Sequence, residues 1–388
     1  MIFRSYLLSF LLLISLAGSL CATEKIIIAE NGGGNEFLEH TLVGITLTAT
    51  KNVDFLELHV VMTADDQLIV FQDLTLNRLT DVATLFPQRS RDDGSYYAID
   101  FSLREIRQLR LKQVFETSEV ALSLGIPTLK EELSVIRKLE SHLGKTIGIA
   151  LEIKEPQFHI LAGKDISMET ITLLASYGYA APESKLYIQC FSPEELQRIY
   201  QELLPPRQMT TPLIQLVGSD MAAETNSYSY EWLYTNSGLR MVANYASALG
   251  LPADKIMDNN GNVLLKEYIT ALHGYGLSIL VKSLSSDPDQ LPGFADTFQG
   301  LITHYFSKTE IDGFYTNSFI SAQEILNHLE IEKSKKDALP EFFSSLDLSP
   351  SSITTTRANV TDKPSIKNDS YKENEANPND VLFLKNEY

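Results

Sequence analysis

The chain has 388 residues, of which 44% are hydrophobic and 21% charged, so most of it can form one or two domains with a buried core. Its formal net charge of −18 argues against nucleic acid or an anionic membrane surface as a partner. An anionic small molecule would need local cations or a metal to bind to such a chain.

The N-terminus has the pattern of a secretory signal peptide over residues 1–22. Arg4 precedes the apolar run "YLLSFLLLISLAG", and small residues follow near "SLCA". The run is too short for a comfortable transmembrane span, so we expect no membrane span after its removal. A lipoprotein attached through Cys21 is the alternative, although Leu20 stands where a small residue is expected. The exported chain then keeps only Cys190, which excludes an internal disulfide.

Short apolar runs rich in β-branched residues alternate with amphipathic helical patterns. We expect strands at 25–29, 55–62, 147–153, 185–191, 212–217, 277–282 and 311–316, with an eighth near 240–246. Helices are predicted at 128–143 and 192–204. This α/β alternation indicates parallel βα units, and eight of them close a (β/α)₈ TIM barrel. An open doubly wound sheet is the alternative.

Two segments depart from the alternation. Residues 74–126, after the second strand, are too long for a simple βα loop and predict a small inserted subdomain that covers the active face. Residues 334–388 are rich in Ser, Thr, Asn, Asp and Pro, which predicts a disordered polar tail. The barrel is therefore expected over residues 23–333.

Acidic side chains stand at the ends of predicted strands, where a barrel carries its catalytic groups. Glu57 and His59 lie two apart on one strand and share a face, as do Glu152 and Lys154 on another. The carboxylates of Glu30, Glu57 and Glu152, with the imidazole of His59, could hold a divalent cation. The plainer interpretation is that these residues face solvent or form ion pairs, and that the glycines after Glu30 serve only a tight turn.

Several motifs, in order along the chain, resemble those of the glycerophosphodiester phosphodiesterase family, closest to its bacterial periplasmic branch. They are "AENGGGNEFLEHT" at 29–41, "LELHVVMTADDQLIVFQD" at 56–73, "NRLTDV" at 77–82, "IPTL" at 126–129, "LEIK" at 151–154, "QCFSP" at 189–193 and "DGFYTN" at 312–317. The resemblance implies a TIM barrel with a small insertion, a bound divalent cation and a small-molecule phosphodiester ligand. It also implies hydrolysis of glycerophosphodiesters to glycerol 3-phosphate and an alcohol, in the periplasm or cell envelope of a bacterium.

The residues of the site depart from the family's pattern. The two catalytic histidines of the family fall on Glu30 and Gln72, and its phosphate-binding arginine falls on Asn31. The aspartate of its metal-binding E-x-D falls on His59, and the closing aspartate is Asn317. The positions that keep the pattern are Glu39, Glu57, Asp73, Glu152 and Lys154. The resemblance thus implies Glu57, His59 and Glu152 as metal ligands, with Asn31 and Lys154 at the substrate.

Gln72 cannot transfer a proton, and Glu30 can do so only if its pKa is raised. Because each acid–base role is worth roughly 10²–10⁴ in rate, we expect weak or lost activity. A non-catalytic family member is one hypothesis. The alternative is a remodelled metal-dependent phosphodiesterase that uses Glu30, Glu57, His59 and Glu152. The imidazole favours Zn²⁺ or Mn²⁺ over the Ca²⁺ or Mg²⁺ of the family, with metal affinity falling below about pH 6.5.

Overall fold

The computed structural model describes residues 25–34, 37, 39–51, 53–112, 124–218 and 228–329. The predicted signal peptide over residues 1–22, the possible lipid attachment at Cys21 and the predicted tail over 334–388 lie outside these residues. In the described part, no helix combines the length and apolar character needed to span a membrane.

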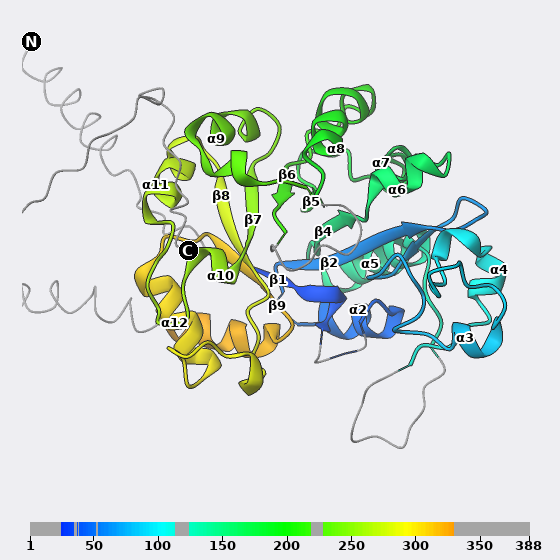
Figure 1. The fold of residues 1–388 in the computed structure, drawn as a ribbon, viewed down its shortest axis with the longest axis horizontal. Coiled ribbons are helices and arrows are strands. Elements are labelled where there is room, and N and C mark those ends of the chain that lie inside the picture. The colour runs from blue at the N-terminus through cyan, green and yellow to red at the C-terminus, as the bar shows by residue number, and fades with distance from the viewer. Residues whose placement is uncertain are drawn as a thin grey trace, which may run out of the picture.

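Eight parallel strands of the described chain form a closed barrel. They are β1 (Ile26–Ala29), β2 (Phe55–Met62), β4 (Gly148–Ile153), β5 (Leu186–Cys190), β6 (Leu213–Leu216), β7 (Ala248–Pro252), β8 (Ser278–Lys282) and β9 (Gly313–Thr316). Consecutive strands of this set pair in parallel, and β1 pairs with both β2 and β9, which closes the ring (Figure 1). The TIM barrel is confirmed, and the open doubly wound sheet is excluded.

One predicted strand is wrong. The segment near 240–246 contains the end of helix α9 (Asn236–Val242) and the turn after it, and the strand that completes the barrel is β7. Its sequence "ALGLP" has no β-branched residue, so it carries little strand signal. Gly250 fits there because a Cβ at this position would lie 2.7 Å from Leu216 Cδ2 on the neighbouring strand.

Helices pack around the outside of the barrel (Figure 1). They include α2 (Leu42–Ala49), α5 (Leu129–Leu143), α6 (Pro156–Leu161), α7 (Ile166–Ser176), α8 (Pro193–Arg198), α9, α10 (Ala253–Ile256), α11 (Lys266–Gly274) and α12 (Phe298–Lys308). The predicted helix at 128–143 is α5, which begins with a capping box between Thr128 and Glu131. The one predicted at 192–204 is α8, which is capped by Ser192 and continues into a π-helical turn over Ile199–Leu203.

The chain between β2 and α5 builds a lobe beside the barrel. Strand β3 (Leu68–Val70) pairs antiparallel with β2, and the short helices α3 (Val82–Leu85) and α4 (Leu103–Ile106) follow (Figure 1). Phe71, Phe101 and their neighbours form an apolar cluster separate from the main core. The described residues of the predicted insertion at 74–126 belong to this lobe, and its boundaries stay a prediction.

Residues alternate along each barrel strand between two apolar environments. On β4, Ile149 and Leu151 belong to the layer shared with the outer helices, whereas Ala150 belongs to a smaller interior cluster. Glu152 continues the interior row after Ala150, because side chains two apart on a strand share a face. This alternation positions polar side chains inside the barrel, near the carboxyl ends of the strands, which we call the mouth.

Candidate active site

Strands β2 and β4 bring three of the predicted site residues together. The strands pair so that His59 lies opposite Glu152. His59 Nε2 is 3.4 Å from Glu57 Oε1 and 3.2 Å from Glu152 Oε2, and all three side chains are buried. The sequence pattern therefore located the cluster, because the period of two along a strand fixes which side chains share a face.

This cluster fits one divalent cation. The three residues each offer a ligand atom, and these atoms all lie within 4.8 Å of one another. Two carboxylates and an imidazole form a donor set suited to Zn²⁺ or Mn²⁺. Glu30, the fourth ligand of the remodelled-site hypothesis, does not belong to this group among the described residues.

The charges of the cluster support one another. Burial acts to raise the pKa of Glu57, but Lys282 and His59 lower it to about 2. Burial likewise opposes ionisation of Glu152, and the charges of Lys154 and His59 hold its pKa well below the usual range. Both carboxylates are therefore ionised at neutral pH.

The same carboxylates act on His59 in the opposite direction. Burial acts to lower the pKa of its imidazole, but Glu57 and Glu152 raise it to about 9. The expectation that metal affinity falls only below about pH 6.5 is therefore corrected. Without a metal, His59 carries a proton that a cation must displace throughout the neutral range.

Hydrogen bonds hold Glu57 from two other walls of the barrel. Gln189 Nε2 on β5 donates to Glu57 Oε1 at 2.9 Å, and the Tyr315 hydroxyl on β9 donates to Gln189 Oε1 at 2.6 Å. The backbone N–H of Asn31 donates to Glu57 Oε2 at 3.4 Å. Asn31 therefore contributes its main chain to the site, a role that its side-chain identity could not reveal.

His40 was missed as a site residue, although it lies within the matched motif "EHT". Its Nε2 is 3.0 Å from His59 Nδ1, and its side chain is buried. Burial and then the charge of His59 keep the pKa of His40 well below its ordinary value. A neutral His40 can accept the Nδ1–H of His59, which leaves His59 Nε2 directed at the two carboxylates. His40 has φ +46°, a strained conformation for a non-glycine residue.

Two lysines reach the cluster from different strands. Lys154, just beyond β4, has its Nζ 2.7 Å from Glu152 Oε1, so the predicted ion pair is present. Lys282, the last residue of β8, has its Nζ 3.6 Å from Glu57 Oε1. No motif marked Lys282, because only the closure of the barrel brings β8 to the site.

Glu30 lies at the carboxyl end of β1, where the chain enters a 3₁₀ turn. The Ser283 hydroxyl donates to Glu30 Oε1 at 2.8 Å. Burial, and next the charge of Glu57, raise the pKa of Glu30 to about 7, against the opposing effects of Lys282 and Ser283. The condition under which Glu30 could transfer a proton at neutral pH is therefore met.

Gln72 and its neighbours are tied to a different partner. Arg78 donates through a terminal nitrogen to Gln72 Oε1 at 2.6 Å and through Nε to Asp73 Oδ2 at 2.8 Å. The same guanidinium lies 3.7 Å from Glu39 Oε1. Gln72 is thus hydrogen-bonded at the edge of the lobe and makes no described contact with Glu57, His59 or Glu152.

The glycines after β1 are explained by the backbone. Gly32, Gly33 and Gly34 all have positive φ, and a Cβ at Gly34 would lie 2.7 Å from Asn317 Cα. The loop packs directly against the end of β9. This geometry supports the interpretation as a tight turn.

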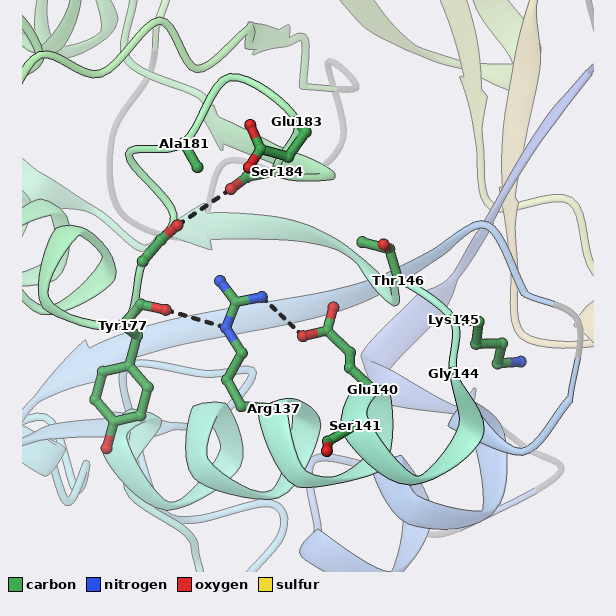
Figure 2. Close-up of a pocket in the computed structure, with 11 residues that line it drawn as sticks. Arg137, Glu140, Ser141, Gly144, Lys145, Thr146, Tyr177, Ala181, Glu183 and Ser184 are labelled. Carbon is green, nitrogen blue, oxygen red and sulfur yellow. Dashed lines mark hydrogen bonds and ion pairs between the residues drawn. The ribbon is translucent and has the colours of Figure 1, made fainter.

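A pocket of about 550 Å³ lies at the opposite end of the barrel, where β4 and β5 begin (Figure 2). Arg137 on α5 donates to the Tyr177 carbonyl at 3.0 Å and to Glu140 Oε2 at 2.7 Å, so its charged group is paired within the wall. The pocket contains none of the predicted site residues.

The closed barrel, with buried carboxylates, an imidazole and lysines at its mouth, defines a (β/α)₈-barrel protein with a candidate cation- and anion-binding site. The sequence model of the "Glycerophosphoryl diester phosphodiesterase family" matches residues 31–319, and the chain belongs to this family. A glycerophosphodiester phosphodiesterase of Treponema pallidum is 34% identical over 315 residues, covering 74% of this chain and 88% of the relative. One of Haemophilus influenzae is 32% identical over 329 residues, covering 78% and 90%.

Solved structures share the fold. A putative glycerophosphoryl diester phosphodiesterase of Agrobacterium tumefaciens aligns with a TM-score of 0.55 at 15% identity, over 79% of this chain and 99% of that chain. An Oleispira antarctica phosphodiesterase, in complex with the product sn-glycerol-3-phosphate, aligns with a TM-score of 0.50 at 16% identity, over 78% and 96%. At these identities the likeness establishes the barrel alone.

Proposed function

We propose that the chain is an exported, metal-dependent hydrolase that converts glycerophosphodiesters to glycerol 3-phosphate and an alcohol, with weak turnover. Its family membership supports the reaction class. The observation that carries the proposal is that Glu57, His59 and Glu152 each bring a ligand atom to within 4.8 Å of the others, near Glu30, whose pKa is raised to about 7.

Glu57, His59 and Glu152 would hold the cation, and Zn²⁺ or Mn²⁺ suits them better than the Ca²⁺ or Mg²⁺ that the family resemblance implies. When bound, the cation would neutralise charge on the phosphoryl oxygens. Gln189 and the Asn31 main chain keep Glu57 oriented, and His40 keeps the ring of His59 oriented.

Glu30 is our candidate for proton transfer, as a base. It would take the proton from the glycerol hydroxyl beside the phosphate as that oxygen attacks phosphorus and the bond to the alcohol breaks. Water then opens the resulting cyclic phosphate, and Glu30 would return its proton to the glycerol oxygen that leaves phosphorus. Gln72 cannot protonate the departing alkoxide, which would take its proton from water, and one missing acid is worth roughly 10²–10⁴ in rate. This deficit is the reason we propose weak activity.

The test is an assay of the purified mature protein on glycerophosphocholine and glycerophosphoethanolamine with Zn²⁺, Mn²⁺, Ca²⁺ and Mg²⁺. We expect slow release of glycerol 3-phosphate, fastest with Zn²⁺ or Mn²⁺, and a loss of about 100-fold in kcat on Glu30→Gln. Glu183→Gln, at an exposed residue near the opposite end of the barrel, is the matched control. Activity that Glu30→Gln leaves unchanged would refute the assigned role of Glu30.

Ligand binding without turnover is the second candidate function. The residue at position 72 favours it. The resemblance implies a catalytic histidine there, but Gln72 cannot titrate and its side-chain oxygen already accepts a hydrogen bond from Arg78. Binding of glycerol 3-phosphate with no product from any substrate or metal would establish this candidate and exclude the first.

Export is proposed from the sequence of residues 1–22 and places the protein in the periplasm or cell envelope of a bacterium. Fractionation of a bacterial host that expresses the full chain would test it. We expect a shortened, periplasmic protein, and a full-length cytoplasmic product would contradict the proposal.

A further inference from the structure

The strongest unassigned feature of the mouth is a second lysine opposite the first. Following the ring of strands in either direction, β8 is four steps from β4, so Lys282 and Lys154 project from opposite walls of the barrel. Their side chains nevertheless meet at one aromatic ring. Lys282 Nζ lies 5.6 Å and Lys154 Nζ 5.9 Å from the centroid of Phe191, which follows β5.

The two ammonium groups differ in how their donors are used. Lys154 Nζ lies 2.7 Å from a Glu152 oxygen, whereas Lys282 Nζ is 3.6 Å from Glu57 Oε1, longer than a hydrogen bond. Within the described residues, Lys282 Nζ also lies over the faces of Tyr315, at 4.8 Å, and Phe191, and its charge acts on Glu30 and Glu152. An ammonium carries three donors, so those of Lys282 stay available.

Both lysines can reach a ligand at the mouth. The side chain of Lys154 is 21% exposed and that of Lys282 is 17% exposed, whereas the carboxylates that anchor them are 2–3% exposed. A buried acid therefore holds each ammonium group from the protein side, and part of each lysine side chain stays exposed. The anchoring also removes part of the entropic cost of ordering two long side chains around a ligand.

We propose that Lys282 and Lys154 form a clamp for the phosphoryl group of the substrate, with Lys282 supplying the positive charge that Asn31 does not. The inference rests on the proposed function for the identity of the ligand, a phosphate ester such as glycerol 3-phosphate. The clamp binds an oxyanion between the two ammonium groups, next to the ring of Phe191. It needs no proton transfer and therefore acts whether or not the chain turns substrate over.

The experiment measures binding apart from catalysis. The mature protein is treated with EDTA, and inorganic phosphate and glycerol 3-phosphate are titrated by calorimetry at pH 7.5 and low salt. We expect Lys282→Gln and Lys154→Gln each to lower the affinity for both anions by about 10-fold or more, because a charge-assisted contact is lost. The affinity of Lys282→Arg for both anions should stay within about threefold of that of the unsubstituted protein. Lys185→Gln, an exposed lysine before β5 at the opposite end, should have no effect.

A rescue variant separates the clamp from general loss of structure. In the Lys282→Gln background, Asn31→Arg should restore most of the affinity, because it returns a cation to the same ligand. A measurement on the unsubstituted protein covers the case in which Lys282→Gln does not fold. Glycerol 3-phosphate should protect Lys154 and Lys282, and not Lys185, from acetylation measured by mass spectrometry.

The outcomes separate this inference from the proposed function. No binding of either anion by the unsubstituted protein at 10 mM, an affinity unchanged by Lys282→Gln, or no protection of Lys282 would overturn the clamp. Binding that depends on Lys282 without any product from glycerophosphodiesters would support the clamp and refute the hydrolase.

Discussion

His59 determines what the site does with a proton and with a metal. Its imidazole stands between two ionised carboxylates, so the metal-free site carries a cation of its own. A divalent ion must exchange places with the proton on Nε2. The residue that makes a Zn²⁺ or Mn²⁺ site chemically reasonable is therefore also the one that competes with the metal.

The first prediction follows from this competition. Because the pKa of His59 is about 9 and only the neutral ring ligates, binding of Zn²⁺ at pH 7.5 should release about one proton. Affinity should rise by up to about tenfold per pH unit from pH 7 to 9 and then level off. Calorimetric titration in two buffers of different ionisation enthalpy measures the released proton. His59→Asp should abolish the release and shift preference toward Ca²⁺, and tight proton-free binding by the unsubstituted chain would contradict the exchange.

The second prediction concerns repair of the site. Glu30→His with Gln72→His should not restore full activity, because the arginine at position 31 and the aspartate at position 59 would still be missing. Residues that act as a unit contribute non-additively, so adding Asn31→Arg and His59→Asp should raise kcat well above that of the double variant. The measurement is steady-state kinetics on glycerophosphocholine. Full activity in the double variant would show that the other two changes carry little weight.

At the scale of elements, the loop after β1 links the site to the end of the barrel. Gly34 lies so close to Asn317 that no side chain fits, and its φ is +51°. Movement of this loop would disturb the main-chain N–H of Asn31 and hence Glu57. The glycines therefore act on the site through the position of the backbone.

A matched pair of variants tests this packing. Gly34→Ala should lower the free energy of unfolding by about 1–3 kcal/mol more than Gly163→Ala. Both glycines have positive φ, but a Cβ at Gly163 meets nothing within 4 Å, so the control carries the backbone strain without the overlap. Urea unfolding of both variants measures the difference. Equal losses would show that the loop gives way to a side chain.

The elements that the sequence predicted well are those with periodic patterns. The row of Glu57 and His59 was readable because β2 is long and alternates, and α5 was readable because its sequence is amphipathic over 15 residues. β7 was misplaced because "ALGLP" is short and has a glycine. Lys282 and Ser283 could not be found, because their relation to Glu57 and Glu30 exists only once β8 has joined the ring.

At the scale of the whole molecule, a buried histidine should make stability depend on pH. His159 on α6 accepts from the Met62 N–H at the end of β2 at 3.2 Å, and mainly burial lowers its pKa to about 4. In the unfolded chain this histidine binds a proton near pH 6.5. The contribution of the neutral His159 to stability is therefore fully present above that pH and is lost as the pH falls toward 4. The expected loss reaches about 3 kcal/mol.

Urea unfolding at several pH values between 4 and 7.5 measures this dependence. His159→Gln should flatten the curve in this window, since glutamine does not titrate there. An unchanged slope in the variant would assign the acid sensitivity to other groups.

The closure of the barrel has a consequence for the order in which the chain can fold. Strand β1 pairs with β9, and Lys25 Nζ donates to the Ile311 carbonyl, 286 residues away. Contacts of such high sequence separation form slowly and only after the last strand has been synthesised. The ring therefore cannot close until β9 has been synthesised, a delay that is compatible with the proposed export of a chain that has not yet folded.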